Sequence, residues 1–167
     1  WFDITEEGNF EGKSIPNLLK QRDLHEDFQQ YLPLVYRYRK SRTQLHLDDK
    51  LLTAWNALMI AALSSLYRVS GARQYLESAK KAQRFLENAL CENDTLFVSF
   101  RNGKRGEKGF LDDYAFYIFA LLALYEATFH PPYLEKARRL CDKTLADFYD
   151  MENGGFYTYG KENQQLI

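Results

Sequence analysis

The chain has 167 residues, 46% of them apolar and 27% charged, which is typical of one globular, soluble domain and not of a disordered chain. A formal net charge of −1 gives no basic field for nucleic acid or for an anionic membrane surface. The longest uncharged apolar run, residues 114–125, is much shorter than the roughly 20 residues that cross a bilayer, so we expect a cytoplasmic protein without a membrane span.

The first part of the chain is predicted to hold one extended segment and one helix. Because residue 1 is Trp, within sequence of extended character, we expect a piece of a longer protein. The extended or loop segment covers residues 1–24 and the helix residues 25–42, in which Pro33 predicts a kink or a break. The turn at 8–13 has glycines on both sides and either presents Glu11 to a ligand or is an ordinary surface turn. It lacks the spacing of a phosphate loop.

The remainder of the chain contains an internal repeat. Residues 60–79 and 118–137, which are 58 positions apart, share 9 identities in 20, among them the pattern Tyr-Leu-Glu-x-Ala. Each repeat predicts a helical hairpin, 51–91 and 112–150, in which the first helix is largely apolar and the second is amphipathic. We expect the apolar helices to be inner and enclosed on every side, and the amphipathic helices to be outer. The fold predicted is all-α, in concentric layers, with short β-hairpin-like loops at 95–104 and 154–163.

Acidic pairs precede both inner helices. Asp48 and Asp49 stand before the first, and Asp112 and Asp113 before the second. Such residues often only cap the helix N-terminus, where they accept hydrogen bonds from free N–H groups. In a toroid both pairs would instead open into one central cup, where two carboxylates can perform acid–base chemistry on a sugar. The catalytic candidates are therefore Asp49, Asp112 and Asp113.

Further polar and aromatic residues near these helix ends are candidates for binding a substrate. They are His46, Asp48, Lys50, Trp55, Asn56, Tyr114 and, from the early turn, Glu11. Sugar rings stack on aromatic faces, although most aromatic side chains of the chain are expected to fill the core. Cys91 and Cys141 lie in apolar helical patterns without ligand spacing, which predicts structural thiols, no metal and no cofactor.

Five motifs, in order along the chain, resemble the middle portion of the spermatogenesis-associated, thioredoxin-domain-containing protein family: GNFEGK (8–13), HLDDKLLTAWNALMIAAL (46–63), GFLDDYA (109–115), ALLALYEATF (120–129) and NGGFY (153–157). The resemblance implies an (α/α)6 toroid similar to six-hairpin glycosidases and N-acylglucosamine 2-epimerases, of which this chain would hold about two hairpins. It also implies an N-terminal thioredoxin-like domain outside this piece, because no Cys-x-x-Cys is present. Leu47 and Ala57 depart from the family pattern, which expects a polar residue and Gly there.

The expected function is a carbohydrate-active module, glycosidase-like or epimerase-like, that holds a sugar or another small molecule in the cup. Asp49 and one of Asp112 or Asp113 would be acid and base, while Trp55 and Tyr114 orient the ring. The alternative is a non-catalytic helical scaffold that works with the thioredoxin-like domain. A third hypothesis is a structural fragment, which should expose the surface of its inner helices and self-associate. Nucleic acid and membranes are not expected partners.

Overall fold

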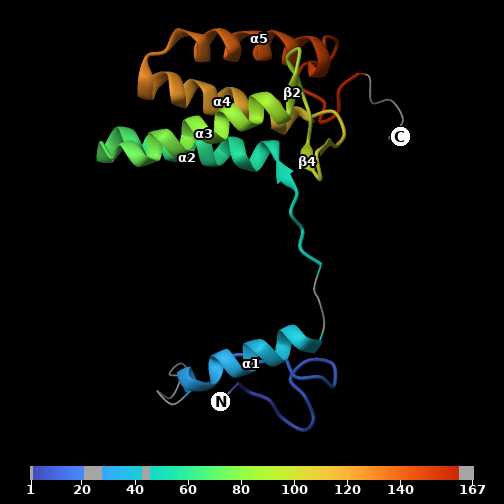
Figure 1. Cartoon of the computed structure of the whole chain (residues 1–167). Helices are drawn as coiled ribbons and strands as arrows, with labels where there is room; N and C mark the ends of the chain where they lie inside the picture. Colours follow the sequence, from blue (N-terminus) through green and yellow to red (C-terminus); the bar gives the residue numbers. More distant parts are fainter. Residues whose placement is uncertain (1, 21–27, 43–45, 162–167) are drawn as a thin grey trace. The chain divides into compact units, whose positions relative to one another are not determined.

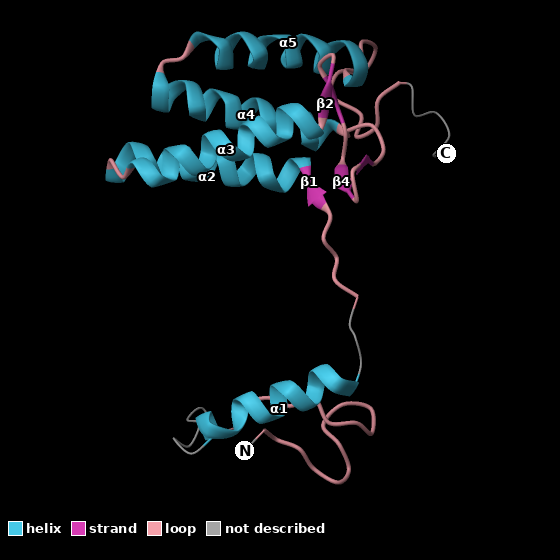
Figure 2. Cartoon of the chain, viewed as in Figure 1, coloured by secondary structure: helices cyan, strands magenta, loops and turns pink. Residues whose placement is uncertain are grey.

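The computed structural model describes residues 2–20, 28–42 and 46–161, which form two compact units, 1–47 and 48–167 (Figures 1 and 2). The order of elements is α1 (Phe28–Arg42), β1 (Leu51–Leu52), α2 (Thr53–Ser70), α3 (Arg73–Ala89), β2 (Cys91–Glu92), β3 (Thr95–Leu96), β4 (Ser99–Arg101), β5 (Lys104–Arg105), α4 (Leu111–Thr128) and α5 (Pro131–Phe148). Helices thus dominate the second unit, as predicted. Each unit is described separately below.

The first unit contains the early turn and α1. Asn9 organises the turn: its Nδ2 donates to the carbonyl of Ile15 (2.9 Å) and its Oδ1 accepts from the N–H of Ile15 (2.7 Å). Gly8 has a φ of 80°, and a Cβ there would lie 2.6 Å from the carbonyl oxygen of Lys13, so only glycine fits. Helix α1 continues through Pro33 and has no buried residue. Residues 21–24 and 25–27, within the predicted loop and helix, lie outside the described residues.

The second unit consists of two helical hairpins that match after a shift of 58 residues. Helix α2 begins at Thr53 and α4 at Leu111, and each has 18 residues. Each inner helix ends at a residue in the left-handed conformation, Gly71 with a φ of 69° and Phe129 with a φ of 52°, which turns the chain into the outer helix. The predicted repeat of helical hairpins is confirmed.

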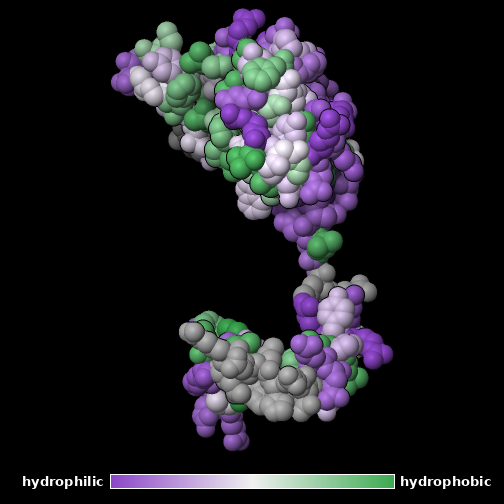
Figure 3. All heavy atoms as spheres, turned by 90° about the vertical axis from the view of Figure 1, so that its left-hand side faces the viewer, coloured by the Kyte–Doolittle hydropathy of each residue, from purple (hydrophilic) through white to green (hydrophobic). Residues whose placement is uncertain are grey.

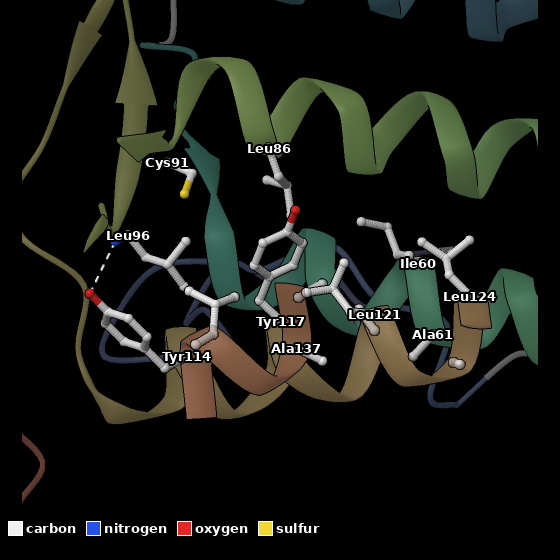
Figure 4. Close-up of a cluster of buried hydrophobic side chains, with 14 of the residues drawn as sticks. Ile60, Ala61, Leu86, Cys91, Leu96, Tyr114, Tyr117, Leu121, Leu124 and Ala137 are labelled. Carbon is white, nitrogen blue, oxygen red and sulfur yellow. Dashed lines mark hydrogen bonds between the residues drawn. The ribbon is translucent and has the colours of Figure 1, made fainter. Parts of the chain in front are cut away.

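The four helices pack in two layers. Helix α2 packs against α4 to form the inner layer, and α3 and α5 cover them, each mainly against the inner helix of its own hairpin. Figure 4 shows the core between them, in which Tyr117, Leu121 and Leu124 of α4 lie against Ile60 of α2 and Leu86 of α3. All five side chains are at most 1% exposed, so this core contributes most of the hydrophobic stabilisation.

Extended segments follow each outer helix at the end where the inner helices begin: short strands follow α3, and a single β-bridge follows α5. Strands β2 and β3 form an antiparallel pair with Cys91 opposite Leu96, and the second hairpin repeats this contact as a bridge between Tyr149 and Phe156. Strands β1, β4 and β5 form a small antiparallel sheet in that order. The hairpin-like loops predicted at 95–104 and 154–163 lie in these regions, with residues 162 and 163 outside the described part.

One expectation about the inner helices is not met. Both inner helices were expected to be enclosed on every side, but α4 exposes Phe119 and Leu122, and α2 has an open face with Trp55, Leu58, Met59, Leu66 and Val69. The reason is that α3 and α4 cover only the remaining faces of α2. Figure 3 views the second unit from the end at which α2 and α4 finish, where hydrophobic side chains (green) reach the surface between hydrophilic ones.

Candidate functional site

The N-terminal ends of α2 and α4 lie side by side, and each is fixed by the loop that follows its own outer helix. The N–H of Thr53 donates to the carbonyl of Val98 (3.0 Å), and the N–H of Leu111 donates to the carbonyl of Thr158 (3.0 Å). The Thr53 hydroxyl also donates to the carbonyl of Phe97 (2.5 Å). These bonds use donors that a helix N-terminus cannot satisfy internally. The two acidic pairs of the sequence, Asp48–Asp49 and Asp112–Asp113, lie at this end of the second unit.

Asp113 joins the two helix ends. Its Oδ2 accepts from the N–H of Phe110 at the start of α4 (2.9 Å), and its Oδ1 accepts from the N–H of Ala54 in the first turn of α2 (3.1 Å). The residue is 2% exposed. Burial raises the pKa of its carboxyl group to about 6, and the neighbouring Asp112 adds to this, whereas the two N–H donors oppose it. Asp113 therefore caps two helices at once.

The other acidic residues are exposed at the same helix ends. Asp112 is in the first turn of α4 and its Oδ1 accepts from the N–H of Asp113 (3.1 Å). Asp49 pairs with Arg101 of β4 at 2.5 Å, and about half of its side chain is exposed. Asp48 pairs with Lys50 at 3.4 Å, and a hydrogen bond from the Lys50 N–H lowers the pKa of Asp48. Three carboxylates thus remain open to solvent beside the one that is buried.

The predicted aromatic and amide candidates occupy different environments. Trp55 is 72% exposed and lies in the first turn of α2, at the position that Asp113 holds in α4. Tyr114 is buried: its hydroxyl oxygen accepts from the N–H of Leu96 (3.1 Å; Figure 4). Its ring packs 5.3 Å from that of Phe148. Asn56 is half-buried and donates to the carbonyl of Leu52 (2.8 Å). Of the two aromatic candidates, Trp55 has its ring open to solvent and Tyr114 does not.

Two predicted site residues belong to the first unit. Glu11 is exposed in the turn at 8–13, where it adopts a φ of 48°. His46 is exposed near the end of the unit. Their roles as substrate-binding residues stay predictions.

A second polar cluster, which the sequence did not reveal, lies between the outer helices. Lys136 of α5 is 8% exposed, and its Nζ contacts Oε1 of Glu87 (2.5 Å), Oδ1 of Asp94 (2.7 Å) and Sγ of Cys91 (3.3 Å). The hydroxyl of Tyr117 donates to Oε2 of Glu87 (2.8 Å). The two carboxylates raise the pKa of Lys136 against the effect of burial, so the ammonium group stays charged. We call these five residues the Lys136 cluster.

The only sequence signal for the Lys136 cluster is weak. Lys136 occupies the repeat position that Ser78 holds in the first hairpin, so a lysine replaces a small residue on an amphipathic helix. Lysine on such a helix usually faces water. Here it can be buried because Glu87 of α3 and Asp94 of the β2–β3 turn pair with its charge.

A small cavity of about 110 Å³ lies beside the buried Tyr114. Its walls include polar side chains of the β3 and α5 regions, namely Thr95, Lys108, Lys143, Asp147 and Lys161. The cavity has room for a few water molecules and is too small for a sugar ring with its hydroxyls. Within the described ranges, no three His, Cys, Asp or Glu side chains are grouped to hold a metal ion. No helix among the same residues is long and apolar enough to span a membrane.

Comparison with known proteins finds relatives of this chain by sequence. No protein-family model matches it. It is 33% identical over 136 residues to spermatogenesis-associated protein 20 of Homo sapiens, which is 75% of this chain and 17% of that protein. It is 29% identical over 175 aligned residues to an uncharacterised protein of Caenorhabditis elegans, which is 85% of this chain and 24% of that protein. The chain therefore spans a quarter or less of these relatives.

Several solved structures with a similar fold are named as enzymes of sugars. Cellobiose 2-epimerase of Spirochaeta thermophila matches with a TM-score of 0.60 and 24% identity, over 65% of this chain and 28% of the other. The GH76 α-mannanase of Bacteroides thetaiotaomicron matches with a TM-score of 0.62 and 23% identity, over 69% and 33%. A D-mannose isomerase matches with a TM-score of 0.60 and 19% identity, over 69% and 31%. The chain therefore belongs with spermatogenesis-associated protein 20 and its relatives over the segment that aligns, and it has the fold of part of an (α/α)6 toroid.

Proposed function

We propose that the second unit forms part of a carbohydrate-active cup, at the end where α2 and α4 begin. The observation that carries the proposal is the pair of parallel inner helices joined by Asp113, with the carboxylate of Asp112 exposed beside them. The names of the solved structures with this fold, two epimerizing or isomerizing enzymes and a mannanase, support a sugar as the ligand. Fold alone is a weak argument for function, so the test of this proposal is to mutate the site residues.

The exposed residues suit contact with a sugar. Asp112 and Asp49 can accept hydrogen bonds from hydroxyl groups or exchange a proton with the substrate. Trp55 presents an open ring on which a pyranose can stack. Helix N-termini add a positive potential that favours negative charge developing on a substrate oxygen.

Asp113 has a different role in this proposal. Both of its carboxyl oxygens already accept main-chain hydrogen bonds, and only 2% of the residue is exposed. It would hold the two helix ends, and hence Asp112, in position. Its pKa of about 6 also lets it carry a proton near neutral pH more often than an ordinary aspartate does. It stays a candidate acid for a substrate that reaches it.

The proposal can be tested with the whole chain on a glycan array, followed by epimerisation and hydrolysis assays on the glycans that bind. Asp112→Asn removes the charge with little change of shape, and Trp55→Ala removes the ring. We expect each change to weaken binding at least tenfold, which corresponds to about 1.4 kcal/mol. Asp142→Asn is the matched control, because Asp142 is likewise an exposed aspartate on a helix, α5.

Two results would contradict this function. Asp112→Asn and Trp55→Ala could bind as tightly as Asp142→Asn, which would remove the helix ends as the site. Alternatively, the unmodified chain could bind no glycan at all. Circular dichroism melts of each variant separate lost binding from lost folding.

The alternative proposal is a non-catalytic scaffold that works with a thioredoxin-like domain. Apolar side chains exposed on α2, such as Leu58 and Leu66, offer contact area for a protein partner and favour this reading. It predicts no conversion of any sugar, together with measurable association between the chain and a separately produced thioredoxin-like domain. Isothermal titration calorimetry distinguishes it from the carbohydrate proposal.

A further inference from the structure

The small cavity beside Tyr114 lies where the two hairpins meet. Its walls come from the segments that follow α3, from the first turn of α4, from the C-terminal part of α5 and from the loop after α5. The polar residues among them are Thr95, Lys108, Tyr114, Lys143, Asp147 and Lys161. The two hairpins therefore form this cavity between them, and the open faces of α2 and α4 take no part in it.

The charged walls of the cavity are mainly cationic, with three lysines and one aspartate. Lys143 pairs with Asp147 at 2.9 Å, and 30% of the lysine side chain is exposed. The Nζ of Lys161 donates to the carbonyl of Ala146 (2.8 Å). An ammonium group carries three N–H donors, so Lys161 can keep this contact and bind a ligand as well. The balance of charge favours an anion.

Tyr114 adds a buried donor to the cavity. Its hydroxyl oxygen accepts from the N–H of Leu96, but among the described residues its O–H donates to no acceptor. Burial raises the pKa of Tyr114, so the hydroxyl keeps its proton and remains a donor. A buried donor without an acceptor lowers stability, which gives an acceptor in the cavity a favourable contribution. Because only 2% of Tyr114 is exposed, this donor is not an ordinary surface group.

The repeat shows that the backbone does not require charged residues here. A shift of 58 residues places Lys143 on Phe85 and Asp147 on Ala89 of the first hairpin. There the ring of Phe85 packs 6.0 Å from that of Phe100, so apolar side chains meet at the equivalent place. The second hairpin has two charged residues instead. This difference favours a ligand, rather than packing alone, as the reason for the polar cavity.

We propose that the cavity binds one tetrahedral oxyanion of the phosphate type, held by the ammonium groups of Lys108, Lys143 and Lys161 and by the hydroxyl of Tyr114. Ammonium and hydroxyl donors suit the oxygens of such an anion. The volume of about 110 Å³ admits an anion of this size and excludes a sugar ring. This inference does not depend on the proposed function, because it concerns a different set of side chains and requires no reaction.

The test is isothermal titration calorimetry of the whole chain with inorganic phosphate, at an ionic strength held constant with sodium chloride. We expect saturable binding of one phosphate per chain. Lys143→Met removes the charge with little change of length and should weaken binding about tenfold. Lys80→Met is the matched control, because Lys80 of the outer helix α3 is also 30% exposed and also pairs with a carboxylate, Glu77. It should bind phosphate like the unmodified chain.

Two further variants separate binding from a general loss of structure. Tyr114→Phe removes only the O–H donor and should weaken phosphate binding about fivefold. Asp147→Asn removes the one negative charge of the walls and should instead tighten binding about threefold. General damage to the fold would weaken binding in both variants. Circular dichroism melts show whether each variant is folded at the temperature of the titration.

A hexose phosphate, titrated in the same way, distinguishes a free anion from the phosphate group of a larger ligand. Binding of inorganic phosphate alone assigns the cavity to the free anion, and equal binding of both assigns it to a phosphate group whose sugar stays outside. The proposal is overturned if the unmodified chain shows no saturable binding of either compound. It is equally overturned if Lys143→Met binds as tightly as Lys80→Met, because the anion would then lie elsewhere.

Discussion

The two hairpins of the second unit have one backbone plan but different residues where they meet. Their helices begin 58 residues apart, and each inner helix is fixed by the loop after its own outer helix. At the first turn of the inner helix, however, α2 carries the exposed Trp55 and α4 carries the buried Asp113. The backbone plan therefore sets the helix ends, and single substitutions at equivalent positions decide whether an end binds its neighbour or faces solvent.

Mutation of the Lys136 cluster should give the largest difference in stability between equivalent positions of the two hairpins. We expect Lys136→Ala to lower the free energy of unfolding by about 2–4 kcal/mol, because Glu87 and Asp94 lose the cation that neutralises them in a partly buried site. Ser78→Ala changes the equivalent, exposed position of the first hairpin and should cost less than about 0.5 kcal/mol. Urea unfolding measures both. Equal losses would mean that the cluster does not stabilise the second hairpin.

The cap that Asp113 provides is the next largest difference. Asp113→Ala leaves the N–H groups of Ala54 and Phe110 without their acceptor, so we expect a loss of about 2–3 kcal/mol. Trp55→Ala removes an exposed ring and should cost less than about 0.5 kcal/mol. Thermal melts followed by circular dichroism compare the two. A large loss in Trp55→Ala alone would show that this ring is buried by a partner.

Asp113 should also make stability depend on pH. Its pKa is raised to about 6 in the folded chain and is near 3.8 in the unfolded chain, so the folded state binds the proton more tightly. The contribution of this group is fully present below about pH 4 and is lost as the pH rises through about 6, an effect on the order of 3 kcal/mol.

The check is the difference in unfolding free energy between the unmodified chain and Asp113→Asn, measured from pH 4 to pH 7. We expect this difference to move against the unmodified chain as the pH rises. A difference that stays constant over the range would show that Asp113 titrates normally in the folded protein.

The turns between inner and outer helices give the smallest expected effect. Gly71 has a φ of 69°, and a Cβ there would meet no atom within 4 Å, so Gly71→Ala should cost only the backbone strain of about 1 kcal/mol. Phe129 holds the equivalent position with a φ of 52° and packs its ring 6.1 Å from that of Tyr125. Phe129→Gly relieves the strain but loses this contact, so we expect a change within about 0.5 kcal/mol in thermal melts. A stabilisation above 1 kcal/mol would show that the ring adds nothing.

Much of the fold could be predicted because it depends on local periodicity. The repeat between residues 60–79 and 118–137 and the contrast between apolar and amphipathic helices both survive in the structure. The exposed face of α2 could not be predicted, because periodicity shows that a helix surface is apolar and not whether a neighbour covers it.

The candidate site was less accessible to sequence reasoning. The spacing of the acidic pairs in the sequence is compatible both with helix caps and with open, reactive carboxylates. The structure shows that Asp113 reaches Ala54, 59 residues earlier in the chain, and that Asp49 reaches Arg101, 52 residues later. Such pairs depend on how helices and strands pack, which local patterns do not encode. For the same reason, Tyr114 could be placed next to the acidic pair in sequence while its hydroxyl points into the core.

The hydrogen bond from the Ala54 N–H to Asp113 makes the start of α2, in the first hairpin, depend on α4 in the second. The Ala54 N–H finds its acceptor in the next repeat, so it loses that acceptor whenever α4 opens, even when α2 itself stays helical. Stability is thereby transmitted along the repeats from neighbour to neighbour. Hydrogen exchange at the single amide of Ala54 would report the opening of a helix that begins 57 residues further along the chain.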